Sequence, residues 1–131
     1  MSKTTVAVYG TLLSGLHNHQ LFEIHPEEVK FLGRGLADFY AIMYSAGGFP
    51  ILSFIEPEYR PVVELYEVGE QTLKLLDQLE GYPGWYDRQE RNFICHTGEK
   101  VRAFIYFQND TRDLEIVPEG NWRKFKAGGN Y

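Results

Sequence analysis

The strongest constraint on the fold is the contrast between one helical segment and a series of short strand-like runs. Residues 70–80 carry apolar side chains at helical spacing, and the helix-ending signals Gly81 and Pro83 follow them. Elsewhere, glycine, proline or asparagine separates runs of β-branched and aromatic residues. We expect strands at residues 4–9, 31–44, 51–55, 61–68, 86–96 and 100–108, the second with a bulge or bend near Gly33 and Gly35. About five to seven strands with one helix predict an α+β, largely antiparallel fold, and a closed β-barrel is one form of it.

Composition and charge narrow the class of protein. The 131 residues fit a single domain over 1–131, and a net charge of −5 disfavours a nucleic-acid-binding surface. No apolar run reaches the roughly 20 residues that a membrane helix needs. The first residues lack the apolar stretch of a signal peptide, so we expect a cytoplasmic protein without membrane contact.

Several reactive side chains have ordinary structural interpretations. Cys95 is the only cysteine, which excludes an intrachain disulfide, and its strand-like surroundings indicate a packed thiol. Its neighbour His96 is expected on the opposite face of the strand. His17 and His19 have no second cluster of ligands to complete a metal site, and residues 27–28 are expected to be solvated charges.

The first motif with chemical potential is the turn Tyr9-Gly10-Thr11-Leu12 at the end of the first strand. Glycine permits unusual backbone dihedrals and the close approach of a ligand. Free N–H groups at such a turn can hold a carboxylate or an oxyanion. The alternative is an ordinary glycine that ends a strand. Neither a dinucleotide-binding nor a phosphate-binding glycine motif follows, which disfavours nucleotides.

The second motif is the end of the helix. At about 100° per residue, Glu80 lies within roughly 40° of Leu73 and Leu76, which must pack inward. Burial raises the pKa of a carboxyl group and suits it to proton transfer. The alternative is a solvated helix end. Asp77, about 60° away on the other side, is a rival acid or a residue that holds nearby backbone.

Together these residues resemble the γ-glutamyl cyclotransferase-like family, which includes the γ-glutamylamine cyclotransferases. The resemblance spans about residues 5–108. It rests on Tyr9-Gly10-Thr11-Leu12, Gly48-Phe49-Pro50, Val63-Glu64-Leu65-Tyr66-Glu67-Val68, Leu76-Asp77-Gln78-Leu79-Glu80-Gly81-Tyr82-Pro83 and Tyr86-Asp87-Arg88, in the family's order and spacing.

The resemblance implies a compact mixed β-barrel with flanking helices and a small-molecule γ-glutamyl substrate. It implies that the backbone of Tyr9, Gly10, Thr11 and Leu12 binds the α-amino acid end of that substrate and that Glu80 is the catalytic acid/base. Tyr86 would line the pocket, and Gly48, Phe49 and Pro50 would form its edge. The expected reaction is ring closure to 5-oxoproline with release of an amine, which requires neither a metal nor an organic cofactor.

Other functions remain open on the sequence alone. The chain could be a noncatalytic binding or interaction module with the same fold, although the presence of Glu80 favours the enzyme. It could also remove a γ-glutamyl group within a biosynthetic pathway. The leaving amine and the oligomeric state are not encoded in any motif.

Overall fold

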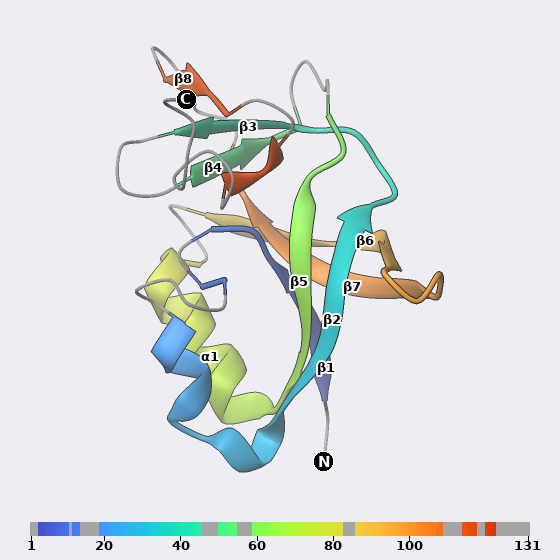
Figure 1. Ribbon diagram of the computed structural model, residues 1–131. Coiled ribbons are helices and arrows are strands. Elements are labelled where there is room, and N and C mark those ends of the chain that lie inside the picture. The colour runs from blue at the N-terminus through green and yellow to red at the C-terminus, as the bar shows by residue number, and fades with distance from the viewer. Residues whose placement is uncertain are drawn as a thin grey trace.

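The structure, a computed structural model, describes residues 3–10, 12–13, 19–45, 50–54, 59–82, 86–108, 114–117 and 120–122 (Figure 1). Its elements in chain order are β1 (Thr4–Val8), the 3-10 helices η1 (His19–Glu23) and η2 (Pro26–Glu28), β2 (Val29–Ala37), β3 (Ile42–Ser45), β4 (Pro50–Ser53), β5 (Val62–Val68), α1 (Glu70–Glu80), β6 (Asp87–Cys95), β7 (Lys100–Phe107) and β8 (Glu115–Ile116). None of the helices among these residues is both long and apolar enough to cross a membrane.

Five strands form a closed barrel in the order β1-β5-β2-β6-β7. All neighbours are antiparallel except β1 and β7, whose parallel pairing closes the barrel. Ala7 pairs with Leu65 on one side and Ile105 on the other, and all three side chains are fully buried. The predicted α+β fold with a closed, largely antiparallel barrel is therefore confirmed.

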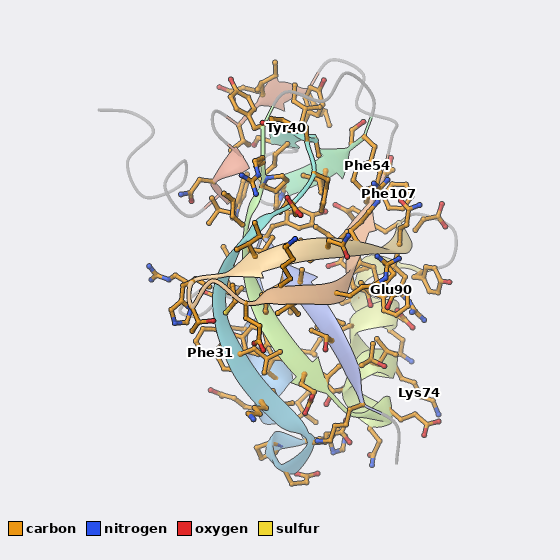
Figure 2. The ribbon with its side chains drawn as sticks, turned by 90° about the vertical axis from the view of Figure 1, so that its right-hand side faces the viewer. Phe31, Tyr40, Phe54, Lys74, Glu90 and Phe107 are labelled. Carbon is orange, nitrogen blue, oxygen red and sulfur yellow. The ribbon has the colours of Figure 1, made fainter. Side chains whose placement is uncertain are left out.

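A second sheet, in the order β4-β3-β8, lies at one end of the barrel (Figure 1). It is attached to β7 by the backbone N–H of Gln108, which donates to the Leu52 carbonyl oxygen at 2.9 Å. The rings of Phe54 and Phe107 pack there with centroids 4.7 Å apart, and Figure 2 shows them close together. These contacts join the end of β4 to the end of β7.

Residues 31–44, predicted as one strand, belong to two strands in different sheets. The backbone of Ala37 donates to Pro61 and that of Asp38 to Asn92, which ties the end of β2 into the barrel before the chain crosses to β3. The predicted bulge is confirmed, because the register with β5 shifts between Phe31 and Gly33. The described residues form eight strands, more than expected, because β8 adds a short strand in the C-terminal part.

Helix α1 has the predicted bounds, residues 70–80. Gly81 adopts a left-handed conformation, with φ 68° and ψ 35°. The N–H of Tyr82 donates to the Asp77 carbonyl at 2.8 Å and that of Gly81 to the Gln78 carbonyl at 3.2 Å. This pair of bonds is a Schellman motif, which fixes the chain direction immediately after Glu80.

Glu28 is not the solvated charge that the sequence suggested. Its carboxylate accepts the Thr72 N–H at 2.7 Å, and its carbonyl accepts the Gly69 N–H at 3.0 Å. A residue 44 positions away thus caps the N-terminus of α1, where a negative charge is also favourable to the helix dipole.

We expect Glu28→Gln to lower the free energy of unfolding at neutral pH. The bond from Thr72 is the main cause that lowers the pKa of Glu28 below 4.5 in the folded state. The stabilisation is therefore present above the unfolded pKa and is lost as the pH falls through the folded one. Urea denaturation at pH 7 and at a pH below about 3 would measure this. The adjacent Glu27→Gln is the control, because the Glu27 side chain is 69% exposed, and an equal loss in both variants would contradict the capping role.

Candidate active site

Tyr9 and the residues after it form a tight turn at the end of β1. The Tyr9 ring is buried, and its hydroxyl donates to the Tyr106 carbonyl oxygen at 2.7 Å. The N–H of Leu13 donates to the Gly10 carbonyl at 2.9 Å and closes the turn. The Leu12 side chain is buried in the core, so only its backbone could contact a ligand. Thr11 lies outside the described residues.

Gly10 is required by close packing rather than by an unusual dihedral, because its φ is not in the left-handed region. A Cβ atom at Gly10 would lie 2.5 Å from Cγ and 2.7 Å from Cδ of Pro50. The atoms nearest this position are therefore those of β4, not an open space for a ligand. The turn and the first residue of β4 pack in direct contact.

We expect Gly10→Ala to destabilise the protein by about 2 kcal/mol, because the added methyl group overlaps a rigid proline ring. Urea denaturation would measure the loss. In a Pro50→Ala background the same substitution should cost much less, since the overlapping ring atoms are gone. An equal cost in both backgrounds would show that the Pro50 contact is not the reason for glycine.

Tyr86, in the segment before β6, also contacts Pro50. Its ring is buried, and its hydroxyl donates to the Pro50 carbonyl oxygen at 2.8 Å. Pro50 therefore contacts both Gly10 and Tyr86, which are 76 positions apart in sequence. Gly48 and Phe49, the other residues of the expected pocket edge, lie outside the described residues.

Glu80 is partly buried at the end of α1, on the same side as the fully buried Leu76. Burial raises the pKa of its carboxyl group from 4.5 to about 7. Burial is also the main cause that raises the pKa of Tyr9, Tyr86 and Tyr106, and the negative charge of Glu80 adds to it in each case. Glu80 thus lies close enough to all three hydroxyl groups for its charge to affect them.

The carboxylate of Asp77, the other candidate acid, is bound by two side chains. It accepts bonds from the guanidinium of Arg88 and from the hydroxyl of Tyr106. It therefore holds side chains rather than the backbone that the sequence suggested. Arg88 belongs to the sequence motif Tyr86-Asp87-Arg88, but the sequence predicted no role for its side chain. Tyr106 had no sequence signal, because it is one of several aromatic residues in a strand.

Cys95 is buried, as expected, but His96 does not point to the opposite face. β6 ends at Cys95, and His96 belongs to the following turn, so strand alternation no longer applies. The Cys95 Sγ lies 3.5 Å from both His96 Nδ1 and the Leu32 carbonyl oxygen. A Cβ atom at Gly33 would lie 2.4 Å from the His96 ring, so glycine is also needed for this contact.

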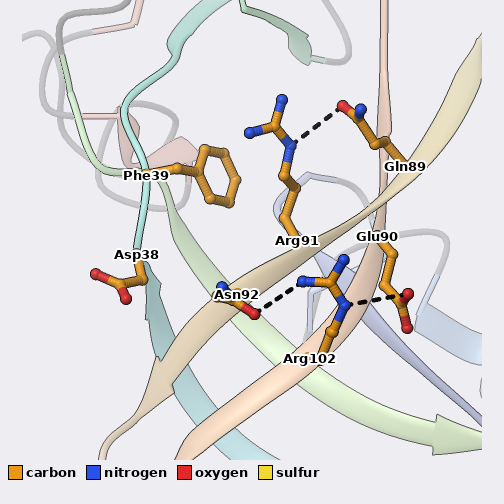
Figure 3. Close-up of a pocket in the computed structure, with 7 residues that line it drawn as sticks. All are labelled: Asp38, Phe39, Gln89, Glu90, Arg91, Asn92 and Arg102. Carbon is orange, nitrogen blue, oxygen red and sulfur yellow. Dashed lines mark hydrogen bonds and ion pairs between the residues drawn. The ribbon is translucent and has the colours of Figure 1, made fainter.

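A surface pocket of about 390 Å³ lies elsewhere on the molecule (Figure 3). It is lined by Asp38, Phe39, Gln89, Glu90, Arg91, Asn92 and Arg102. None of these residues belongs to the predicted site. Its two arginines are matched by two acidic residues, so the pocket has no net charge to select a ligand. Within the described parts of the chain, no group of three or more His, Cys, Asp or Glu side chains lies close enough to hold a metal ion.

Comparisons with known proteins show which family this chain resembles. The family described as "Gamma-glutamyl cyclotransferase, AIG2-like" matches residues 6–124. A putative gamma-glutamylcyclotransferase of Methanocaldococcus jannaschii is 33% identical over 122 residues, which cover 93% of this chain and 98% of the relative. The gamma-glutamylaminecyclotransferase of Mus musculus is 31% identical over 112 residues, 77% of this chain and 75% of the relative.

A solved structure has the same fold. The crystal structure of an AIG2-like protein from Mus musculus superposes with a TM-score of 0.75 at 26% sequence identity. The matched region covers 93% of this chain and 95% of that one. The barrel, the second sheet and the helix thus form an arrangement that related proteins share.

Proposed function

The chain belongs to the gamma-glutamyl cyclotransferase, AIG2-like family, and on that premise we propose that it releases 5-oxoproline and a free amine from a γ-glutamyl-amine, with Glu80 as the acid/base. The observation that carries this proposal is the state of Glu80. Its carboxyl group has a pKa of about 7, so the acid and the base are both populated at neutral pH.

The expected substrate site lies between the turn at residues 9–12 and the end of α1. The α-carboxylate of the γ-glutamyl group would bind backbone N–H groups of the turn, as carboxylates do at such turns. Tyr86 would line the cavity beside Glu80, and the segment before Pro50 would form its edge. The support is that Pro50 contacts both Gly10 and Tyr86, and that the charge of Glu80 reaches Tyr9 and Tyr86.

The proposed chemistry uses Glu80 first as a base and then as an acid. Glu80 takes a proton from the α-ammonium group, and the freed nitrogen lone pair attacks the γ-carbonyl carbon to close a five-membered ring. Negative charge develops on the carbonyl oxygen, where backbone N–H groups near Gly10 could stabilise it. The bond to the leaving nitrogen then breaks as protonated Glu80 returns a proton to it. The ring nitrogen loses its second proton, which the released amine takes up to become an ammonium group. The products are 5-oxoproline and an amine, and the carboxylate is regenerated.

Binding must also fold the substrate, because the free molecule is flexible. Holding the α-amine against the γ-carbonyl converts a rare conformation into the bound one, which contributes several kcal/mol at most, because the two groups already belong to one molecule. Buried tyrosines with raised pKa values remain neutral, so they exclude water without adding charge.

The test is the release of 5-oxoproline from a panel of γ-glutamyl-amines and γ-glutamyl amino acids, detected by chromatography. Substrates with an acetylated α-amine are the matched control, because they cannot close the ring. Release of glutamate instead of 5-oxoproline would replace ring closure by hydrolysis. No turnover of any member of the panel would favour the noncatalytic binding module.

A further inference from the structure

The carboxylate of Asp77 is the centre of a polar network between α1 and two strands of the barrel. Arg88 of β6 donates through Nε to Oδ1 at 3.0 Å and through Nη2 to Oδ2 at 3.3 Å. Tyr106 of β7 donates its hydroxyl to Oδ1 at 2.7 Å. The Arg88 and Asp77 side chains are only 18% and 20% exposed, so water competes weakly for these bonds. A bidentate ion pair of this kind fixes the relative orientation of the two side chains as well as their distance.

Arg88 is itself held in place by aromatic rings. Its guanidinium carbon lies 4.4 Å from the ring centroid of Tyr82 and 5.0 Å from that of Phe104. Tyr82 follows the helix-ending Gly81, so this contact ties the segment just beyond α1 to the barrel. A planar guanidinium can stack and bind a carboxylate at once, which a lysine ammonium does not do equally well.

The network reaches both parts of the proposed active site. Glu80 follows Asp77 by three residues, so the two are neighbours on the helix surface. At the other end, the carbonyl oxygen of Tyr106 accepts the Tyr9 hydroxyl at 2.7 Å. The chain of bonds from Asp77 through Tyr106 to Tyr9 therefore connects the last turn of α1 to the turn at residues 9–12.

We propose that Asp77, Arg88 and Tyr106 are positioning residues, which hold the last turn of α1 against β6 and β7 so that Glu80 stays within the site and faces the proposed substrate. This inference rests on the proposed function, because the substrate that Glu80 would face belongs to that proposal. The position of Glu80 at the barrel can be measured without substrate. Leu79 on the outer side of the same turn is 43% exposed, so packing on that side contributes less to holding the turn than a fully buried side chain would.

The network acts through geometry rather than through net charge. Among the described residues, the titratable groups that the charge of Glu80 affects are Tyr9, Tyr86 and Tyr106, and the Asp77–Arg88 pair lies one helical turn away. The tyrosines are neutral at neutral pH, and the pair carries no net charge. Burial is the cause that raises the pKa of Glu80, so release of the helix end into water should lower that pKa.

The experiment compares Asp77→Asn, Arg88→Gln, Arg88→Lys and Tyr106→Phe with the wild type. The matched control is Arg102→Gln, because Arg102 also joins β6 and β7 through an ion pair, to Glu90 at 3.1 Å. Those side chains are 57% and 46% exposed. Two readouts are needed: kcat and KM for 5-oxoproline release, and the Glu80 pKa from carbon-13 NMR of the labelled carboxyl, assigned with Glu80→Gln.

We expect Asp77→Asn and Arg88→Gln to lower kcat by about 10- to 100-fold while KM changes far less, since a misplaced catalytic group mainly affects the chemical step. Arg88→Lys and Tyr106→Phe should lose less, and Arg102→Gln nothing. The double variant of Asp77 and Arg88 should be no worse than either single one, because they share one interaction. In both single variants the Glu80 pKa should fall from about 7 toward its ordinary value.

Three outcomes would overturn the positioning role. The first is unchanged kcat and unchanged Glu80 pKa in the variants that remain folded, Arg88→Lys and Tyr106→Phe included. The second is a Glu80 pKa that falls in Asp77→Asn but rises in Arg88→Gln, which is the signature of charge. The third is an equal loss in Arg102→Gln. A wild type without turnover whose Glu80 pKa still falls in the variants would reject the proposed function and keep the positioning role.

Discussion

Glu80→Gln is expected to lower kcat for 5-oxoproline release by about 10³-fold, because one group serves as both base and acid in the proposed reaction. Glutamine keeps the shape and the partial burial of the side chain but can neither take nor return a proton. The α-ammonium group of the substrate would then remain protonated at neutral pH and could not attack. The loss should appear in kcat rather than in KM, since the proposed substrate contacts at the turn of residues 9–12 would be unchanged.

The measurement is steady-state kinetics on the best substrate of the panel, with the folded state checked by circular dichroism. Glu70→Gln is the matched control, because it makes the same change on the same helix, at a side chain that is 75% exposed. It should retain wild-type kinetics. A folded Glu80→Gln protein with more than about a tenth of the wild-type kcat would exclude Glu80 as the acid/base.

The parts of the fold that could be predicted are those specified by neighbouring residues. The bounds of α1 follow from local helical spacing and from Gly81, whose left-handed conformation the sequence signals directly. The division of residues 31–44 between two sheets could not be predicted, because it depends on backbone bonds from Ala37 and Asp38 to distant strands. The capping of α1 by Glu28 was missed for the same reason.

The candidate site shows the same limit. The helical period placed Glu80 beside Leu76, and the motif resemblance supplied Tyr9, Pro50 and Tyr86. Nothing local marks Tyr106, which matters because β7 pairs with β1 and its Tyr106 hydroxyl reaches Asp77 of α1. Its two bonds, to Tyr9 and to Asp77, join residues 97 and 29 positions away. Such pairings become visible only when the strand order is known.

A carboxylate lies at each end of α1, and the two have opposite effects on the stability of the helix. Glu28 caps the N-terminus, where negative charge is favourable, and Glu80 lies at the C-terminus, where it is not. A carboxylate that is partly desolvated at a helix C-terminus lowers the stability of the folded protein. Its presence is explained if the site requires a group that exchanges protons near pH 7, so function and stability should conflict at Glu80.

The conflict leads to a second large effect: Glu80→Gln should stabilise the protein in a pH-dependent manner. The pKa of Glu80 is about 7 in the folded state and 4.5 as the ordinary value of the unfolded chain. Between pH 4.5 and about 7 the folded state binds more protons than the unfolded state. The free energy of unfolding of the wild type therefore falls as the pH rises through this range and becomes level above it. At about 1.4 kcal/mol per pH unit, the full effect is about 3 kcal/mol.

Urea denaturation of both proteins from pH 4 to pH 8 would measure the effect. The difference in the free energy of unfolding between Glu80→Gln and the wild type should grow by about 3 kcal/mol in favour of the variant over this range. The comparison removes the contributions of all other titrating groups, which both proteins share. Glu70→Gln is the control for the same substitution at an exposed side chain of α1. A difference that is constant with pH would mean that Glu80 titrates as a solvated carboxyl, and a group of that kind could not be half protonated at neutral pH as the proposed proton transfer requires.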